Sequence, residues 1–365
     1  MPLEPYHLIA FLIALTIVLW TIPDVKNVGL KFGIVDKPNS RKIHQSPVVR
    51  VGGVSIFTGT FIALLIVWKL GGFDAIPSYQ QGGIWGLVVG SILFFCIGFA
   101  DDIFSLSPFS RLFMQTVVAT LSWFMGVRID FLSVPFSNLI QTEFFSLPIT
   151  IIWLVGMANA INWIDGVDGL AAGVTGIAAV VMLIVTMFMK QPAAALFAAA
   201  LAGSALGFLR YNFNPAQIFM GDGGAYFMGF TLAGVGVIGL VKTTAITAVL
   251  LPYLILAVPI LDMSAVIVSR ISKGKSPFTA DKSHLHHWLL SAGVSQRLTV
   301  LFIYALTFWV GSLALGFSNI PSGWGYAIAA TFLLGSVGWQ VYRNFQLGFK
   351  TQRSHKVNPP KVKSK

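Results

Sequence analysis

The segment from Gly83 to Ala100 reads GIWGLVVGSILFFCIGFA and is followed directly by Asp101 and Asp102. It carries no charge, and a helix needs roughly 20 mainly apolar residues to cross the hydrocarbon core of a bilayer. Two adjacent carboxylates at the carboxyl end of a helix are disfavoured by the helix dipole and by their mutual repulsion, unless a cation or a base compensates them. The segment therefore predicts a membrane-spanning helix that ends in a functional acid pair, and a solvated helix end is the weaker alternative.

The composition of the whole chain agrees with a membrane environment. Hydrophobic residues make up 56% of the 365 residues and charged residues only 10%, and the mean hydropathy is +0.79. A soluble protein carries about 25% charged residues. The net charge of +11 lies in short loops and at the carboxyl terminus, so we expect no nucleic-acid partner. The single cysteine, Cys96, excludes an intramolecular disulfide.

Apolar segments recur along the chain and predict an all-α, polytopic transmembrane helical bundle of about eleven spans. Ten spans are the alternative, because only Lys190, Gln191 and Pro192 separate the sixth segment from the seventh. The segments are His7–Ile22, Val51–Trp68, Gly83–Ala100, Leu112–Val127, Leu147–Ile164, Leu170–Met189, Ala193–Leu209, Ala225–Val241, Thr243–Val268, Leu298–Phe317 and Trp324–Val341.

The basic residues predict how the bundle is oriented. Twenty of the 24 Lys and Arg fall in alternate connections and in the tail beyond the last segment. By the positive-inside rule these connections are cytoplasmic, which puts the N-terminus outside and the C-terminus in the cytoplasm. Residues 1–349 are expected to form a single membrane-embedded domain, and residues 350–365 a basic, disordered cytoplasmic tail near anionic headgroups.

Four polar residues recur at every third position near the end of the fifth segment: Asn159, Asn162, Asp165 and Asp168. Residues three apart share one face of a helix, so the first three are expected to converge. Amide and carboxylate oxygens suit a hard divalent cation such as Mg²⁺. The alternative is a helix-ending turn built from Asp and Gly.

A second aspartate, Asp222, lies between glycines in the sequence Gly221-Asp222-Gly223-Gly224, just before the eighth segment. Glycines allow close approach of the backbone to a ligand, and the N-terminal amides of the following helix favour anions. The nearby Phe219 could stack on a base or anchor the chain at the membrane surface.

Three of the six histidines, His284, His286 and His287, lie in one basic loop beside Lys282. Zinc binding is the weaker interpretation, because no second cluster of ligands is present. Contact with phosphate fits the basic surroundings better.

Two further positions have two interpretations each. The bases of the first cytoplasmic loop set the topology or grip a lipid phosphate; the candidates are Arg41, Lys42 and His44. Asp262 lies within the ninth segment, about two turns from Arg270, and acids inside a membrane carry function or a buried pairing. We favour a structural pairing for Asp262.

These groups together suit phosphoryl transfer, which depends mainly on positioning and on neutralising charge. The four motifs, Asp101-Asp102, Asn159–Gly169, Asn214–Gly224 and His284–His287, occur in the order typical of the polyprenyl-phosphate N-acetylhexosamine-1-phosphate transferase superfamily, which the chain resembles over nearly its whole length. The loop from Asp36 to Lys42 and the His-x-His-His pattern resemble its WecA/TagO branch, which uses UDP-GlcNAc.

The resemblance implies a Mg²⁺-dependent phosphoglycosyltransferase of the plasma or inner membrane, for which Mn²⁺ can substitute. Its active site would face the cytoplasm. It would transfer N-acetylglucosamine 1-phosphate from UDP-GlcNAc to undecaprenyl phosphate and release UMP, as the first membrane step of cell-envelope polysaccharide synthesis. The implied roles are metal binding by Asp222 and Asn162, handling of the lipid phosphate by Asp101 and Asp102, contact with uracil by Asp168 and Phe219, and contact with phosphates or sugar by Asp165, Arg111, Lys282, His284, His286 and His287.

One departure and several alternatives remain. Ala225 stands where the family usually has serine, which puts a hydroxyl contact near the metal in doubt. The second activity to consider is phospho-MurNAc-pentapeptide transfer in peptidoglycan synthesis. A transporter of lipid-linked sugars ranks lower, because its polar groups would lie deep in the spans. A homodimer is left open.

Overall fold

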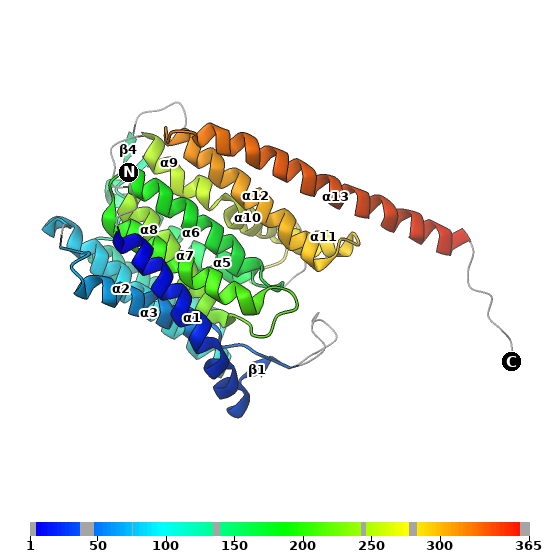
Figure 1. The fold of residues 1–365 in the computed structure, drawn as a ribbon, viewed down its shortest axis with the longest axis horizontal. Helices are drawn as coiled ribbons and strands as arrows, with labels where there is room; N and C mark the ends of the chain where they lie inside the picture. Colours follow the sequence, from blue (N-terminus) through cyan, green and yellow to red (C-terminus); the bar gives the residue numbers. More distant parts are fainter. Residues whose placement is uncertain are drawn as a thin grey trace.

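The computed structural model describes residues 5–36, 47–74, 76–133, 139–241, 246–276 and 283–357. Within them the chain is a bundle of helices with two small antiparallel hairpins at its ends (Figure 1). The helices are α1 (Pro5–Lys31), α2 (Gly53–Lys69), α3 (Ser78–Phe104), α4 (Pro108–Phe124), α5 (Ser146–Ile164), α6 (Leu170–Phe188), α7 (Pro192–Asn212), α8 (Gly221–Gly236), α9 (Ile246–Ile255), α10 (Ala257–Ser272), α11 (Leu285–Ser291), α12 (Gln296–Phe317) and α13 (Gly323–Val357). The strands are β1 (Val35–Asp36), β2 (Val48–Val49), β3 (Phe131–Ser133) and β4 (Leu139–Gln141).

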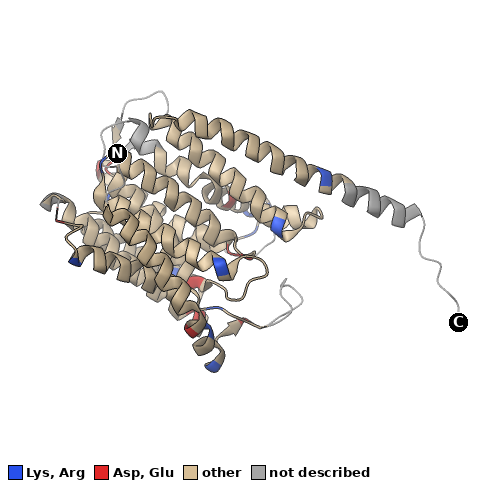
Figure 2. Cartoon of the chain, viewed as in Figure 1, with Lys and Arg blue, Asp and Glu red and all other residues tan. Residues whose placement is uncertain are grey.

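The helices confirm a polytopic membrane protein. Seven of them in the described ranges are long and apolar enough to cross a bilayer, and α2 is a shorter apolar helix. Figure 2 shows that charged residues are sparse along the middle of the bundle and gather toward its ends. Each predicted apolar segment contains a helix, and the sixth and seventh segments are separate helices, α6 and α7. The total number of spans and the placement of the termini stay predictions.

The ninth predicted segment, Thr243–Val268, is not one helix but two, α9 and α10. The cause lies in Pro259. A proline ring clashes with the carbonyl group four residues earlier, and that residue is Ile255, where α9 ends. The hydropathy of the segment does not reveal this break.

The centre of the bundle is α8, which is buried from Gly223 to Gly236. It packs against α3 and α5, while α7 packs against α1 and α6. Small residues allow these contacts: a Cβ atom on Gly98 of α3 would lie 2.3 Å from the backbone oxygen of Asp222, and one on Gly53 of α2 would lie 2.3 Å from the backbone nitrogen of Gly224. Close backbone approach at glycine is a common way for membrane helices to associate. It brings the ends of α2, α3 and α8 to one place.

The last helix, α13, is 35 residues long, or about 50 Å at 1.5 Å per residue, and projects beyond the rest of the bundle (Figure 1). It runs antiparallel to α12, with Trp309 Nε1 donating a hydrogen bond to Thr331 Oγ1 over 2.9 Å. It continues to Val357, past the predicted boundary between residues 349 and 350. No proline lies between Gly323 and Val357, so none breaks this helix.

Candidate active site

A polar cavity of about 420 Å³ lies where α3 and α5 end and α8 begins. Acidic residues dominate its wall, and bases, amides and an aromatic ring complete it. The lining residues are Asp36, Arg50, Asp102, Asp165, Gly166, Val167, Asp168, Asn212, Phe219, Gly221, Asp222, His287 and Gln296. Five of the predicted site residues, from three separate motifs, therefore meet in one place: Asp102, Asp165, Asp168, Phe219 and Asp222. His287 joins them from the histidine loop.

Asp102 holds the beginning of α8. Its carboxylate accepts hydrogen bonds from the backbone N–H groups of Asp222 and Gly223, each over 3.0 Å. It also pairs with Arg50, whose Nη2 lies 3.0 Å from Oδ1. Gly221 allows this approach, because its φ of +73° favours glycine and a Cβ atom there would lie 2.5 Å from Asp102 Oδ2. An acid at a helix N-terminus is stabilised by the helix dipole, so Asp102 acts mainly as a charged cap.

Asp101 makes a different set of contacts. It accepts a hydrogen bond from the backbone N–H of Leu106 over 2.7 Å and pairs with the guanidinium group of Arg111. The same Arg111 nitrogen lies 3.4 Å from Asp222 Oδ2. Arg111 therefore bridges the acid pair and Asp222, and it supplies the positive charge that the adjacent carboxylates require.

Asp222 stands at the meeting point of two helices. Asn162, near the end of α5, donates a hydrogen bond from Nδ2 to Asp222 Oδ1 over 2.7 Å. The Asp222 side chain keeps 27% of its surface exposed, so it faces the cavity and is open to a ligand. This hydrogen bond brings the α5 amide and the glycine-flanked aspartate together at the cavity.

The donor set fits Mg²⁺ bound together with a phosphate. Within the described ranges no group of three His, Cys, Asp or Glu side chains could hold a metal by itself. Mg²⁺, however, is usually held by one or two carboxylates, with substrate phosphates and water completing its octahedron. Asp222 with the amide of Asn162 matches that pattern.

Excess negative charge also surrounds Asp165, which ends α5. Burial raises its pKa well above the usual range, and the carboxylates of Asp222, Asp102 and Asp168 add to the shift. Crowded acids of this kind favour a bound cation.

Asp168 and the loop before α6 are held by the end of α7 and the segment that follows it. Asp168 Oδ2 accepts hydrogen bonds from Asn214 Nδ2 over 3.1 Å and from the backbone N–H of Ala216 over 3.0 Å. Asn212 Oδ1 accepts one from the backbone N–H of Gly169, whose φ is +80°. The segments around Asp168 and Phe219 thus form one wall of the cavity.

The three histidines of the loop have different surroundings. Only His287 lines the cavity. His286 is 1% exposed, and burial together with the neighbouring His287 and His284 lowers its pKa to about 3. His284 pairs with Asp262 at 2.8 Å, so the partner of Asp262 is this histidine and not Arg270. The preference for a structural pairing of Asp262 holds with a different partner.

Some predicted residues cannot be placed, and some lining residues were not predicted. Arg41, Lys42, His44 and Lys282 lie outside the described residues. Ala225 is buried in α8, away from the cavity wall. Four residues line the cavity that were not among the site residues predicted from the sequence: Arg50, Asp36, Asn212 and Gln296. Arg50 carries a signal in retrospect, because it directly precedes Val51-Gly52-Gly53, where α2 begins.

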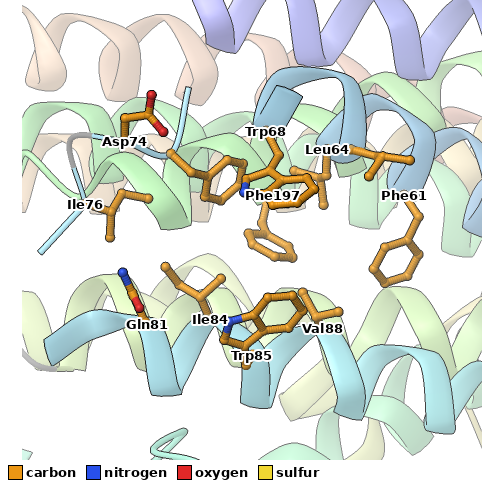
Figure 3. A pocket seen from close by; sticks show the side chains of 12 residues that line it. Phe61, Leu64, Trp68, Asp74, Ile76, Gln81, Ile84, Trp85, Val88 and Phe197 are labelled. Atoms are coloured by element: carbon orange, nitrogen blue, oxygen red, sulfur yellow. The ribbon is translucent and has the colours of Figure 1, made fainter. Parts of the chain in front are cut away.

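A larger pocket of about 590 Å³ lies elsewhere, between α2 and α3 near their other ends. Figure 3 shows Trp68 and Trp85 on its opposite walls. Its lining is mainly aromatic and aliphatic, with Asp74 and Gln81 as its polar members. Phosphoryl transfer needs charged groups, so the smaller polar cavity is the candidate active site.

Comparison with known proteins agrees with this assignment. Glycosyl transferase family 4 matches residues 84–240, which include α3, α5 and α8. A Bacillus subtilis (strain 168) protein named probable undecaprenyl-phosphate N-acetylglucosaminyl 1-phosphate transferase is 36% identical over 302 residues, covering 82% of each chain. A decaprenyl-phosphate N-acetylglucosaminephosphotransferase of Mycolicibacterium smegmatis is 33% identical over 80% of this chain and 76% of its own. An undecaprenyl-phosphate alpha-N-acetylglucosaminyl 1-phosphate transferase of Yersinia pestis is 29% identical over 85% and 84%. The chain therefore belongs to glycosyl transferase family 4.

Proposed function

We propose that the protein transfers N-acetylglucosamine 1-phosphate from UDP-GlcNAc to undecaprenyl phosphate and releases UMP. The membrane-embedded domain would carry out this step at the cytoplasmic face of the cell membrane, with Mg²⁺ or Mn²⁺ as cofactor. The observation that carries the proposal is the position of Asp222, which is hydrogen-bonded to Asn162, lies 3.4 Å from Arg111 and lines a cavity together with Asp168 and Phe219.

The reaction needs two anionic phosphates to approach each other. An oxygen of the lipid phosphate attacks the β-phosphorus of UDP-GlcNAc, and the bond from that phosphorus to the bridging oxygen breaks. The electron pair leaves with UMP, and the sugar phosphate becomes joined to the lipid as a pyrophosphate. Positive charge at the site favours this step, because it offsets the repulsion between reactants and the charge on the leaving group.

The chain's own residues supply most of what this step requires. Arg111, between Asp101 and Asp222, and Arg50, beside Asp102, are the described bases closest to the acids of the cavity. Asp222 and Asn162 would hold Mg²⁺, which when bound neutralises pyrophosphate oxygens. Asp101 and Asp102 are both candidates to engage the lipid phosphate, since Asp102 lines the cavity and Asp101 is linked to Asp222 through Arg111.

The donor end of the cavity fits a nucleoside. Phe219 lies in its wall and offers an aromatic ring for stacking, and Asp168 offers a carboxylate that accepts hydrogen bonds from an N–H donor such as that of uracil. The names of the relatives favour N-acetylglucosamine over the MurNAc-pentapeptide alternative. The acids, Arg50 and the phosphate-facing groups gather at one end of the helices, which favours a transferase over a transporter.

UMP release by the purified protein in lipid nanodiscs tests the proposal. Release should require UDP-GlcNAc, undecaprenyl phosphate and Mg²⁺ together, and Asp222→Ala should lower it at least a hundredfold. Asp24→Ala is the matched control, because Asp24 is an exposed aspartate on α1 outside the cavity. Folded wild-type protein that binds both substrates and the metal without releasing UMP would refute the proposal.

A further inference from the structure

Asp262 of α10 makes two contacts that tie the histidine loop to the membrane bundle. Its Oδ2 atom lies 2.8 Å from His284 Nδ1, and its Oδ1 accepts a hydrogen bond over 2.8 Å from the backbone N–H of Leu285, the first residue of α11. The side chains of Asp262 and His284 are only 7% and 8% exposed. A buried carboxylate is unfavourable unless its oxygens have hydrogen-bond partners, and these two contacts supply one partner to each oxygen.

A continuous set of ring contacts leads from this pair to the active site. The rings of His284 and His286 stack, with their centroids 5.4 Å apart and 12° between their planes. His286 in turn lies against Gly166: a Cβ atom on Gly166 would lie 2.8 Å from His286 Nε2. Gly166 is part of the cavity wall, and so is His287, which directly follows His286.

Asp262 itself does not line the cavity, so it can act on the reaction only through the histidine loop. Arg270, on the next turns of α10, lies over the ring of Trp163 at 4.9 Å, and Trp163 meets His284 edge to face. Two elements therefore face His284 with polar or aromatic groups, but only Asp262 forms a hydrogen bond with its ring in the described residues.

We propose that Asp262 is a positioning residue for the transfer reaction. It fixes His284 and the start of α11, and thereby seats His286 against Gly166 and directs His287 into the cavity. This inference rests on the proposed function for its catalytic consequence. The contacts themselves do not depend on which substrate is used.

Turnover measured on folded protein separates positioning from simple stabilisation. Asp262→Ala should lower kcat about tenfold per folded molecule, with His284→Ala giving a similar loss. The double variant should be no more than about twofold worse than either single variant, because both changes remove the same link. Losses that multiply in the double variant would overturn the proposal, and so would a normal kcat in folded Asp262→Ala.

Asp262→Asn provides a milder change that preserves shape. An amide presents one acceptor and one donor, so it can keep only one of the two bonds unless His284 changes tautomer. We expect an intermediate kcat, and wild-type turnover in this variant would contradict the proposal. Ser264→Ala, on an exposed position of the same helix, is the matched control and should leave kcat unchanged.

Hydrogen exchange in nanodiscs gives a readout that needs no substrate. The Leu285 amide should exchange at least tenfold faster in Asp262→Asn or Asp262→Ala than in wild type, and peptides across 165–170 should also lose protection. Unchanged exchange in both segments would refute the link. If wild-type protein releases no UMP while exchange at Leu285 responds as expected, the proposed function has failed and the anchoring by Asp262 has not.

Discussion

The Asn162 amide and the Asp222 carboxylate are joined by a hydrogen bond of 2.7 Å, which connects the end of α5 to the beginning of α8. The two residues are 60 positions apart in the chain. Both arrive at the cavity from helices that are buried along most of their length, so their relative position is set by the packing of the bundle. A metal ion at this junction would meet ligands that are already in place.

Asn162→Ala should weaken the binding of Mg²⁺ without abolishing it. Removing one oxygen donor beside the principal carboxylate is expected to raise the Mg²⁺ concentration for half-maximal activity about tenfold, in the range typical for lost support at a metal site. A titration of UMP release against Mg²⁺ measures this. Asn159→Ala is the comparison, because Asn159 bonds to Gln115 and not to Asp222. An unchanged Mg²⁺ dependence for Asn162→Ala would remove this residue from the metal site.

Asp101 and Asp102 should respond differently to the same substitution. Asp102→Asn weakens the bonds to two α8 amides and leaves Arg50 without its charged partner, so it should lower the free energy of unfolding by about 2 kcal/mol. Asp101→Asn should lower turnover more than it lowers stability. Thermal unfolding and UMP release on the same preparations compare the two. Equal stability and equal turnover in both variants would contradict the separate roles.

The burial of His286 predicts that the folded protein loses stability in acid. Because burial lowers its folded-state pKa to about 3, from the usual 6.5, the folded protein binds fewer protons than the unfolded chain between these values. The stability that the neutral His286 contributes to the folded protein is therefore complete above about pH 6.5 and is lost as the pH falls toward 3. His286→Phe keeps a ring without a proton to bind, and should show a shallower decline of melting temperature between pH 6.5 and 4.5. Parallel curves for the two proteins would contradict a buried neutral imidazole.

Gly98→Ala should separate α3 from α8. The added methyl group would lie 2.3 Å from the Asp222 backbone oxygen and 2.6 Å from the Gly223 nitrogen. Backbone must move to relieve such a contact, so we expect a loss of about 1–3 kcal/mol in stability and a clear loss of turnover. Gly335→Ala on α13 is the control, because a Cβ atom there meets nothing within 4 Å. Wild-type stability and activity in Gly98→Ala would show that the close approach is not required.

The helices and the main acids of the site could be predicted from the sequence, and the reason is physical. A run of apolar residues that must satisfy its backbone inside lipid forms a helix, and the segments around Leu154 and Leu232 became α5 and α8. Asp222 was identifiable because glycines around an aspartate allow the backbone to approach a ligand closely. These signals are local to each segment.

Contacts between distant segments could not be predicted in this way. The pairing of Arg50 with Asp102 joins residues 52 positions apart, and that of His284 with Asp262 joins residues 22 positions apart. Both depend on how the helices pack and not on spacing. Arg50 was therefore considered only as one of the bases of the first cytoplasmic loop, which set the topology or grip a lipid phosphate. Arg270 was considered as the partner of Asp262 because it lies nearby on the same helix.

The antiparallel pairing of α12 with α13 places two stacked aromatic rings beside the residues that pack against the start of α12. Trp339 and Tyr342 stack on α13, and aromatic rings of this kind favour the boundary between hydrocarbon and water. Leu298 at the start of α12 packs against Val337 and Val341, next to those rings, and Gln296, two residues earlier, lines the cavity. We therefore propose that the cavity opens at the level of the lipid headgroups. A water-soluble donor and a lipid-anchored phosphate can meet there without the nucleotide entering the hydrocarbon or the isoprenoid chain leaving it.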